Sequence, residues 1–70
     1  MPDVEAHITG TVWKIEVQIG ETVQEGDTVV VLESMKMEMP VEAEDPGVVS
    51  EILVEEGQSV SEGDTLVVLE

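Results

Sequence analysis

The chain contains an internal repeat, because residues 4–33 and 41–70 match each other at an offset of 37 residues. Apolar, glycine and acidic residues recur at the same spacing in both copies. The longest identical runs are Val4-Glu5-Ala6 with Val41-Glu42-Ala43, Glu25-Gly26-Asp27-Thr28 with Glu62-Gly63-Asp64-Thr65, and Val30-Val31-Leu32-Glu33 with Val67-Val68-Leu69-Glu70. Two copies of one pattern can pair in space and bury a shared core. We therefore expect residues 1–70 to form a single domain with an approximate twofold axis.

Glycines divide each copy at matching points, residues 10, 20 and 26 in the first copy and 47, 57 and 63 in the second. We expect a turn at each, since glycine permits positive φ angles and the aspartates after Gly26 and Gly63 can bond their own backbone. The residues between these points are rich in valine and isoleucine, which favour strands over helices. The sequence therefore predicts an all-β fold, a flattened barrel or sandwich, with eight strands near residues 4–8, 11–18, 21–24, 28–34, 38–43, 47–54, 58–61 and 65–70.

Two of these strands are apolar throughout, at residues 29–32 and 66–69, as is typical of central strands covered on both faces. The chain has no cysteine, so no disulfide supports the fold and the core must be built from aliphatic side chains. Trp13 is the one aromatic residue. We expect it to be an anchor in the core or on a sheet face.

Charge and hydropathy exclude several classes of partner. Seventeen acidic residues against Lys14 and Lys36 give a formal net charge of −15, which repels nucleic acids and anionic membrane surfaces. No apolar run is long enough to span a membrane, and residues 1–5 lack the basic and apolar parts of a signal peptide. We therefore expect a cytoplasmic monomer that binds neither nucleic acid nor membrane.

Residues 34–40 link the two copies and have no counterpart in the repeat, so we look for function there. Methionine alternates with polar residues in the run Ser34-Met35-Lys36-Met37-Glu38-Met39. A turn at Met35-Lys36-Met37 would join the fourth and fifth strands and place Lys36 in water at the tip of a hairpin. Two methionines that flank a turn cannot both be buried easily, so at least one is expected on an exposed recognition surface.

The sequence resembles the biotinyl/lipoyl carrier domain family, and most closely its stand-alone bacterial attachment and carrier proteins. The resemblance covers nearly the whole chain and is carried by Gly10-Thr11-Val12-Trp13-Lys14-Ile15, residues 17–27, Glu33-Ser34-Met35-Lys36-Met37, Pro46-Gly47 and the turns from Gly57 to Gly63. It implies a barrel-sandwich hybrid of two four-stranded antiparallel sheets with quasi-twofold symmetry. It also implies that the modified lysine, Lys36, lies on a β-hairpin turn.

The resemblance further implies that Lys36 carries a covalent cofactor. Methionine at both flanking positions, Met35 and Met37, is typical of biotin acceptors and of recognition by biotin protein ligase, whereas lipoyl domains usually carry Asp-Lys-Ala. Glu33 and Ser34 complete the hairpin motif, although the family often has alanine in place of Ser34. The implied function is that of a biotin carboxyl carrier, whose biotin arm carries a carboxyl group between biotin carboxylase and carboxyltransferase sites.

Three alternatives stay open at this point. A lipoate ligase could attach lipoate to Lys36 instead, so that the arm would carry acyl groups and electrons between the enzymes of a dehydrogenase complex. The chain could also accept both cofactors. In a different class of function, the barrel would remain unmodified and would only bind a protein partner.

Nothing in the sequence indicates catalysis or metal binding by the chain itself. A lysine amine is nucleophilic only when neutral, and an ordinary pKa near 10.4 leaves about one in a few thousand neutral at pH 7. Glu33 and Glu38 favour the charged form, so we expect Lys36 to be a substrate of another enzyme and the protein to be a non-catalytic carrier. We expect His7 to be solvated on an outer strand.

Overall fold

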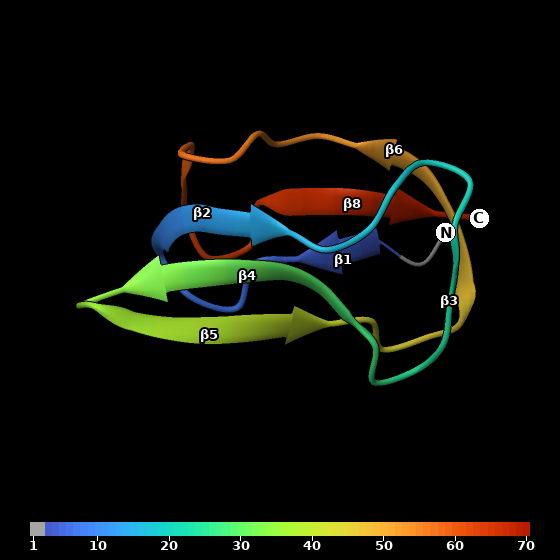
Figure 1. The fold of residues 1–70 in the computed structure, drawn as a ribbon, viewed down its shortest axis with the longest axis horizontal. Coiled ribbons are helices and arrows are strands. Elements are labelled where there is room, and N and C mark those ends of the chain that lie inside the picture. The colour runs from blue at the N-terminus through green and yellow to red at the C-terminus, as the bar shows by residue number, and fades with distance from the viewer. Residues whose placement is uncertain (1–2) are drawn as a thin grey trace.

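The computed structural model describes residues 3–70, which form two four-stranded antiparallel sheets (Figure 1). The strands are β1 (Asp3–Glu5), β2 (Gly10–Ile15), β3 (Thr22–Val23), β4 (Thr28–Ser34), β5 (Met37–Glu42), β6 (Gly47–Ile52), β7 (Ser59–Val60) and β8 (Thr65–Leu69). The predicted all-β fold is confirmed, and each predicted strand has an observed counterpart. Residues 3–70 contain no helix that is long and apolar enough to cross a membrane. Met1 and Pro2, which belong to the segment expected not to be a signal peptide, lie outside the described residues.

The order of the strands shows how the two repeat copies combine. One sheet has the order β1-β8-β6-β3 and the other has the order β5-β4-β2-β7. Exchanging each strand for its repeat counterpart, β1 for β5, β2 for β6, β3 for β7 and β4 for β8, converts one order into the other. The predicted quasi-twofold symmetry is therefore present. Each sheet takes two strands from each copy, so neither sheet is complete without both halves of the chain.

The core between the sheets is aliphatic, as the composition requires. Its sixteen buried residues are Val4, Ala6, Val12, Val17, Val23, Val29, Val30, Leu32, Val41, Ala43, Val49, Val54, Val60, Leu66, Val67 and Leu69. These are eight positions of the first copy and their eight counterparts 37 residues later. No polar or charged residue within residues 3–70 is buried. The repeat therefore encodes the core, and every ionisable group in this range is left at the surface or partly exposed.

Trp13 lies in a β-bulge of β2. The register between β2 and β4 shifts between Val12 and Lys14, so that Trp13 is an extra residue on its strand. Such a residue is left out of the regular alternation of a strand. The Trp13 side chain is 47% exposed. Of the two predicted places for Trp13, the core is therefore wrong, and a place on the face of its sheet remains.

A second bulge explains the apolar run at residues 29–32. The register between β4 and β5 shifts between Thr28 and Val30, so that Val29 and Val30 are both fully buried although they are adjacent. The sheet orders confirm that β4 and its counterpart β8 are central strands. However, Val31 and Val68 are only partly buried, so the prediction that these strands are covered on both faces is wrong. The outer face of each sheet is partly open to solvent.

The turns that precede β4 and β8 form as predicted. Gly26 and Gly63 have φ angles of 90° and 93°, in the region that favours glycine. A carboxylate oxygen of Asp27 accepts a hydrogen bond from the backbone N–H of Gln24 at 2.8 Å. The same bond, also at 2.8 Å, is made in the second copy by Asp64. These aspartate side chains therefore stabilise the turns by accepting hydrogen bonds from backbone N–H groups.

The molecule is elongated, with extents of 31 × 19 × 18 Å. Figure 1 shows the tip of the β4–β5 hairpin at one end of the long axis, and the start of β1 and the end of the chain at the other. Asp3 lies opposite Val68 in the pairing of β1 with β8. Residues 34–40, which have no counterpart in the repeat, thus point away from the end of the molecule where β1 begins and β8 ends.

Candidate functional site

The β4–β5 hairpin ends in a two-residue turn. Its last strand pair is Ser34 with Met37, which leaves Met35 and Lys36 as the turn residues. The prediction of a turn at Met35-Lys36-Met37 is therefore one residue too long, because Met37 already belongs to β5. The lysine lies at the tip of the hairpin, as the resemblance implied.

Both turn residues have left-handed backbone conformations, with φ angles of 53° at Met35 and 64° at Lys36. Positive φ at both central positions is typical of the type I′ turn, whose twist matches that of the strands it joins. Residues other than glycine pay about 1–2 kcal/mol each for this conformation. The hairpin therefore holds two large side chains at positions that usually carry glycine or asparagine.

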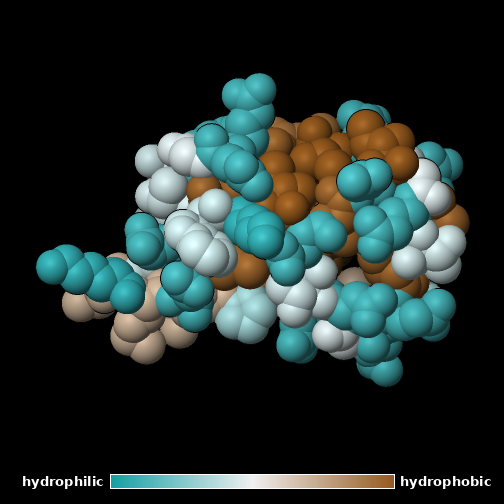
Figure 2. All heavy atoms as spheres, viewed as in Figure 1, coloured by the Kyte–Doolittle hydropathy of each residue, from teal (hydrophilic) through white to brown (hydrophobic). Residues whose placement is uncertain are grey.

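The tip extends beyond the sheet that supports it. Pairing between β2 and β4 reaches as far as Thr11 with Glu33, and Gly10, the first residue of β2, lies beside Ser34, so the turn at Met35 and Lys36 extends beyond the end of β2. Met35 is 92% exposed and Met37 is 59% exposed, and Lys36 is exposed between them. At the same end of the molecule, Figure 2 shows hydrophilic atoms beside moderately hydrophobic ones. The site is a charged side chain with two apolar neighbours, all presented to solvent.

The amine of Lys36 has no ion-pair partner among residues 3–70. Within residues 3–70 the single ion pair joins Lys14 Nζ to Glu16 Oε1 at 3.4 Å. Glu33 and Glu38 are both exposed and lie opposite each other in the hairpin. They form the strand pair next to Ser34 and Met37, on the side away from the turn. Like charges at directly opposed strand positions are destabilising. This acidic pair therefore adds negative charge near the lysine without fixing its side chain.

Gly10 supports the root of the hairpin. It was expected in a turn, as was Gly47, but the two residues are instead the first of β2 and β6. A Cβ atom at Gly10 would lie 2.6 Å from the carbonyl oxygen of Glu33 and 3.5 Å from the Cβ of Ser34. The absence of a side chain thus lets β2 approach the end of β4. Gly10 sets where the overhanging part of the hairpin begins.

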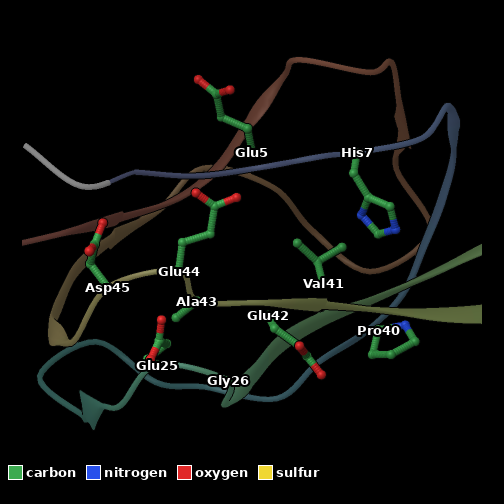
Figure 3. Close-up of a pocket in the computed structure, with 10 residues that line it drawn as sticks. All are labelled: Glu5, His7, Glu25, Gly26, Pro40, Val41, Glu42, Ala43, Glu44 and Asp45. Atoms are coloured by element: carbon green, nitrogen blue, oxygen red, sulfur yellow. The ribbon is translucent and has the colours of Figure 1, made fainter.

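A hollow of about 700 Å³ lies away from the hairpin tip, between the segment that contains β1 and the end of β5 (Figure 3). Its lining includes His7 and the carboxylates of Glu5, Glu25, Glu42, Glu44 and Asp45. Figure 3 shows these side chains coming from different segments and pointing in different directions. Across residues 3–70 no three such groups come together as a metal site. His7 is exposed, as predicted, but it lies in the bend after β1 and not on a strand.

The sequence predicted a site made of Glu33, Ser34, Met35, Lys36 and Met37. Two further residues near the tip, Glu38 and Gly10, were absent from that set. Glu38 was named only as a neighbouring charge, yet it pairs directly with Glu33. A two-residue turn would have predicted this pairing. Gly10 was interpreted only as a turn signal, and no local pattern reveals that a strand from elsewhere in the chain passes close to it.

Comparison with known proteins agrees with this architecture. Residues 1–69 match the biotinyl/lipoyl family described as "Biotin-requiring enzyme", and the chain belongs to that family. A homologue of biotinylated protein TB7.3 from Mycolicibacterium smegmatis is 54% identical over 39 residues, which are 56% of this chain and 55% of the relative. The biotin/lipoyl attachment protein of Bacillus subtilis is 42% identical over 38 residues, which are 54% of this chain and 52% of that protein. The matches thus span about half the length of these curated relatives.

A solved structure extends the similarity to the whole fold. The urea carboxylase of Kluyveromyces lactis superposes with a TM-score of 0.91 and 37% identity over 97% of this chain, which corresponds to 6% of the carboxylase. The chain therefore has the fold of a biotinyl/lipoyl attachment domain.

Proposed function

We propose that Lys36 is the site at which biotin is attached, and that residues 1–70 act as one carrier domain with repeat halves 4–33 and 41–70 and the functional hairpin 34–40. The observation that carries this proposal is the exposed Lys36 amine, which has no ion-pair partner within residues 3–70 and lies at the tip of an overhanging two-residue turn. A free amine in this position can enter the active site of another enzyme without any change in the barrel.

The residues of the hairpin tip are chemically suited to the attachment of biotin. The carboxyl group of biotin can form an amide with the Lys36 amine, and the attached cofactor then supplies the capacity to accept and release a carboxyl group. The rigid hairpin fixes where the tether begins. Met35 and Met37 provide an apolar surface for recognition by a biotin protein ligase, and Glu33 and Ser34 form the end of the strand that leads to the turn.

Biotin is favoured over lipoate, because the family is described as biotin-requiring and a relative from M. smegmatis is named as a biotinylated protein. We propose that the domain serves a biotin carboxylase and a carboxyltransferase in the cytoplasm, as a carrier without catalysis of its own. A tethered arm gives both partners a high local concentration of the same reactive group. The name of the B. subtilis relative includes both cofactors, so lipoate is the competing outcome of the test.

The test is the intact mass of the protein after incubation with a biotin protein ligase, biotin and ATP, compared with incubation with a lipoate ligase and lipoate. We expect one biotinyl group on the wild type and none on Lys36→Arg, which keeps the charge but removes the reactive amine. Lys14→Arg is the matched control, since Lys14 lies in β2 and pairs with Glu16. Biotin on Lys36→Arg, or a lipoyl group alone on the wild type, would refute the proposal.

A further inference from the structure

The most exposed methionines among residues 3–70 are the two residues on either side of Lys36. The chain has no cysteine, so its sulfur chemistry belongs to its four methionines. Met35 and Met37 are 92% and 59% exposed, whereas Met39 is partly buried. Exposed thioethers are open to oxidation by peroxides, which convert a flexible apolar side chain into a polar sulfoxide. The reactive sulfurs thus coincide with the recognition surface of the proposed site.

The pairing along the hairpin explains this gradient of exposure. Val41, Met39 and Met37 lie two residues apart on β5 and so share one face of that strand. Val41 is 3% exposed, Met39 is partly buried, and Met37 is mostly exposed. Met39 lies opposite the buried Leu32, while Met37 lies opposite Ser34, beyond the last pair that β2 supports. The hairpin therefore carries one methionine inside the cover of the barrel and two outside it.

We propose that Met35 and Met37 are sites of reversible oxidation that control whether Lys36 is modified. The reagent is a neutral two-electron oxidant of the peroxide class, which the net charge of −15 does not repel. The thioether sulfur takes one oxygen atom from hydrogen peroxide, an S–O bond forms as the O–O bond breaks, and water leaves. The sulfur is oxidised by two electrons and the peroxide is reduced by two. A dithiol-dependent methionine sulfoxide reductase reverses the step, with water and a disulfide as its products.

The consequence for ligase recognition rests on the proposed function. A ligase that closes over Lys36 must cover the side chains of Met35 and Met37, because both are exposed and are the residues on either side of Lys36 in the chain. Covering a sulfoxide oxygen that finds no hydrogen-bond donor is unfavourable, and we expect the rate of biotin transfer to fall by ~10-fold. The fold should survive, because both side chains lie outside the core and the turn makes its strand pairs through the backbone.

The experiment begins with the cofactor-free protein in hydrogen peroxide, which is then removed with catalase. Peptide mass spectrometry measures the sulfoxide fraction at Met35, Met37 and Met39, and the initial rate of biotin transfer by a biotin protein ligase is measured on the same samples. The double variant Met35→Leu/Met37→Leu removes both exposed sulfurs and keeps apolar side chains. Met39→Leu is the matched control, because it removes the partly buried sulfur of the same hairpin.

We expect Met35 and Met37 to oxidise before Met39, and the oxidised wild type and oxidised Met39→Leu to lose ~10-fold in transfer rate. Methionine sulfoxide reductase should restore the rate, and peroxide should leave the rate of the double variant unchanged. Equal rates for oxidised and untreated wild type would overturn this inference alone. An untreated wild type that takes no biotin would overturn the proposed function and this inference with it. The reductase arm stays decisive even if the leucine variant is a poor substrate.

Discussion

Lys36 is accessible because of the backbone at two adjacent residues. Met35 and Lys36 both have positive φ, and this conformation limits the turn to two residues so that Ser34 can pair with Met37. A shorter turn gives the tip less freedom than a flexible loop would have. The large methionine side chains therefore have defined starting points, although neither contacts the core.

At the residue scale we predict that Met35 and Met37 determine the choice of ligase. The double change Met35→Asp/Met37→Ala should lower kcat/KM for biotin transfer and raise it for lipoyl transfer, because it replaces the apolar surface beside Lys36 with the residues usual in lipoyl domains. The free energy of unfolding should change by no more than ~0.5 kcal/mol, since both side chains are exposed. Steady-state kinetics with both ligases and a thermal melt check this expectation.

Ile19→Asp is the control for the added charge. Ile19 is 67% exposed and lies next to Gly20, outside the hairpin. This variant should leave both transfer rates near those of the wild type. A biotin transfer rate that is unchanged in the double variant at the hairpin would contradict the assignment of Met35 and Met37.

At the scale of the element, the hairpin depends on how closely β2 can approach the end of β4. The repeat offers a comparison for this contact. A Cβ at Gly10 would lie 2.6 Å from the carbonyl oxygen of Glu33, whereas one at Gly47 would lie 3.2 Å from that of Glu70. The same position in the two copies is therefore more crowded beside the hairpin than beside the end of the chain.

We predict that Gly10→Ala destabilises the protein by ~1–3 kcal/mol, since a backbone atom must move to admit the methyl group. Gly47→Ala should cost less, because its nearest contacts are 3.2 Å away and need to move by only a few tenths of an ångström. Chemical denaturation of the two variants measures the difference. Equal losses, or a larger loss at Gly47, would show that crowding against Glu33 does not limit the position of the hairpin.

Much of the fold could be predicted from the sequence, because the repeat specifies all sixteen core positions as eight pairs. The bulges at Trp13 and Val29 could not be predicted, because they depend on the register between strands and not on local composition. The same limit applies at the site. Adjacent residues indicated the lysine and its methionines, while the approach of Gly10 to Glu33 joins positions far apart in the chain and has no local signal.

At the scale of the whole molecule, charge is confined to the outside of an uncharged core. Within residues 3–70 no charged side chain is buried, so the formal net charge of −15 acts almost wholly at the surface. Attachment of biotin removes the charge of one of only two cations, which takes the formal charge from −15 to −16. This small change cannot by itself eject the product from a ligase, so release must depend on local contacts at the tip.

We predict that the acidic surface speeds the encounter with a ligase that presents a basic face. Added salt should then lower kcat/KM for biotin transfer, because the Debye length falls from about 10 Å at 0.1 M to about 3 Å at 1 M salt. The effect belongs to association, so kcat should change little. The measurement is a salt series with a neutral viscosity control. A flat profile would assign the acidic surface to solubility and to protection of the strand edges.

The tip lies at the opposite end of the long axis from the start of β1 and the end of β8, so the barrel can act as a lever. If a flexible connection held the molecule at the pole where β1 begins and β8 ends, any pivoting there would move Lys36 through the widest arc available to the domain. The reach of the cofactor would then be the sum of two motions, the swing of its own tether and the rocking of a stiff arm with the 31 Å length of the barrel. Two active sites too far apart for the tether alone could still share one lysine.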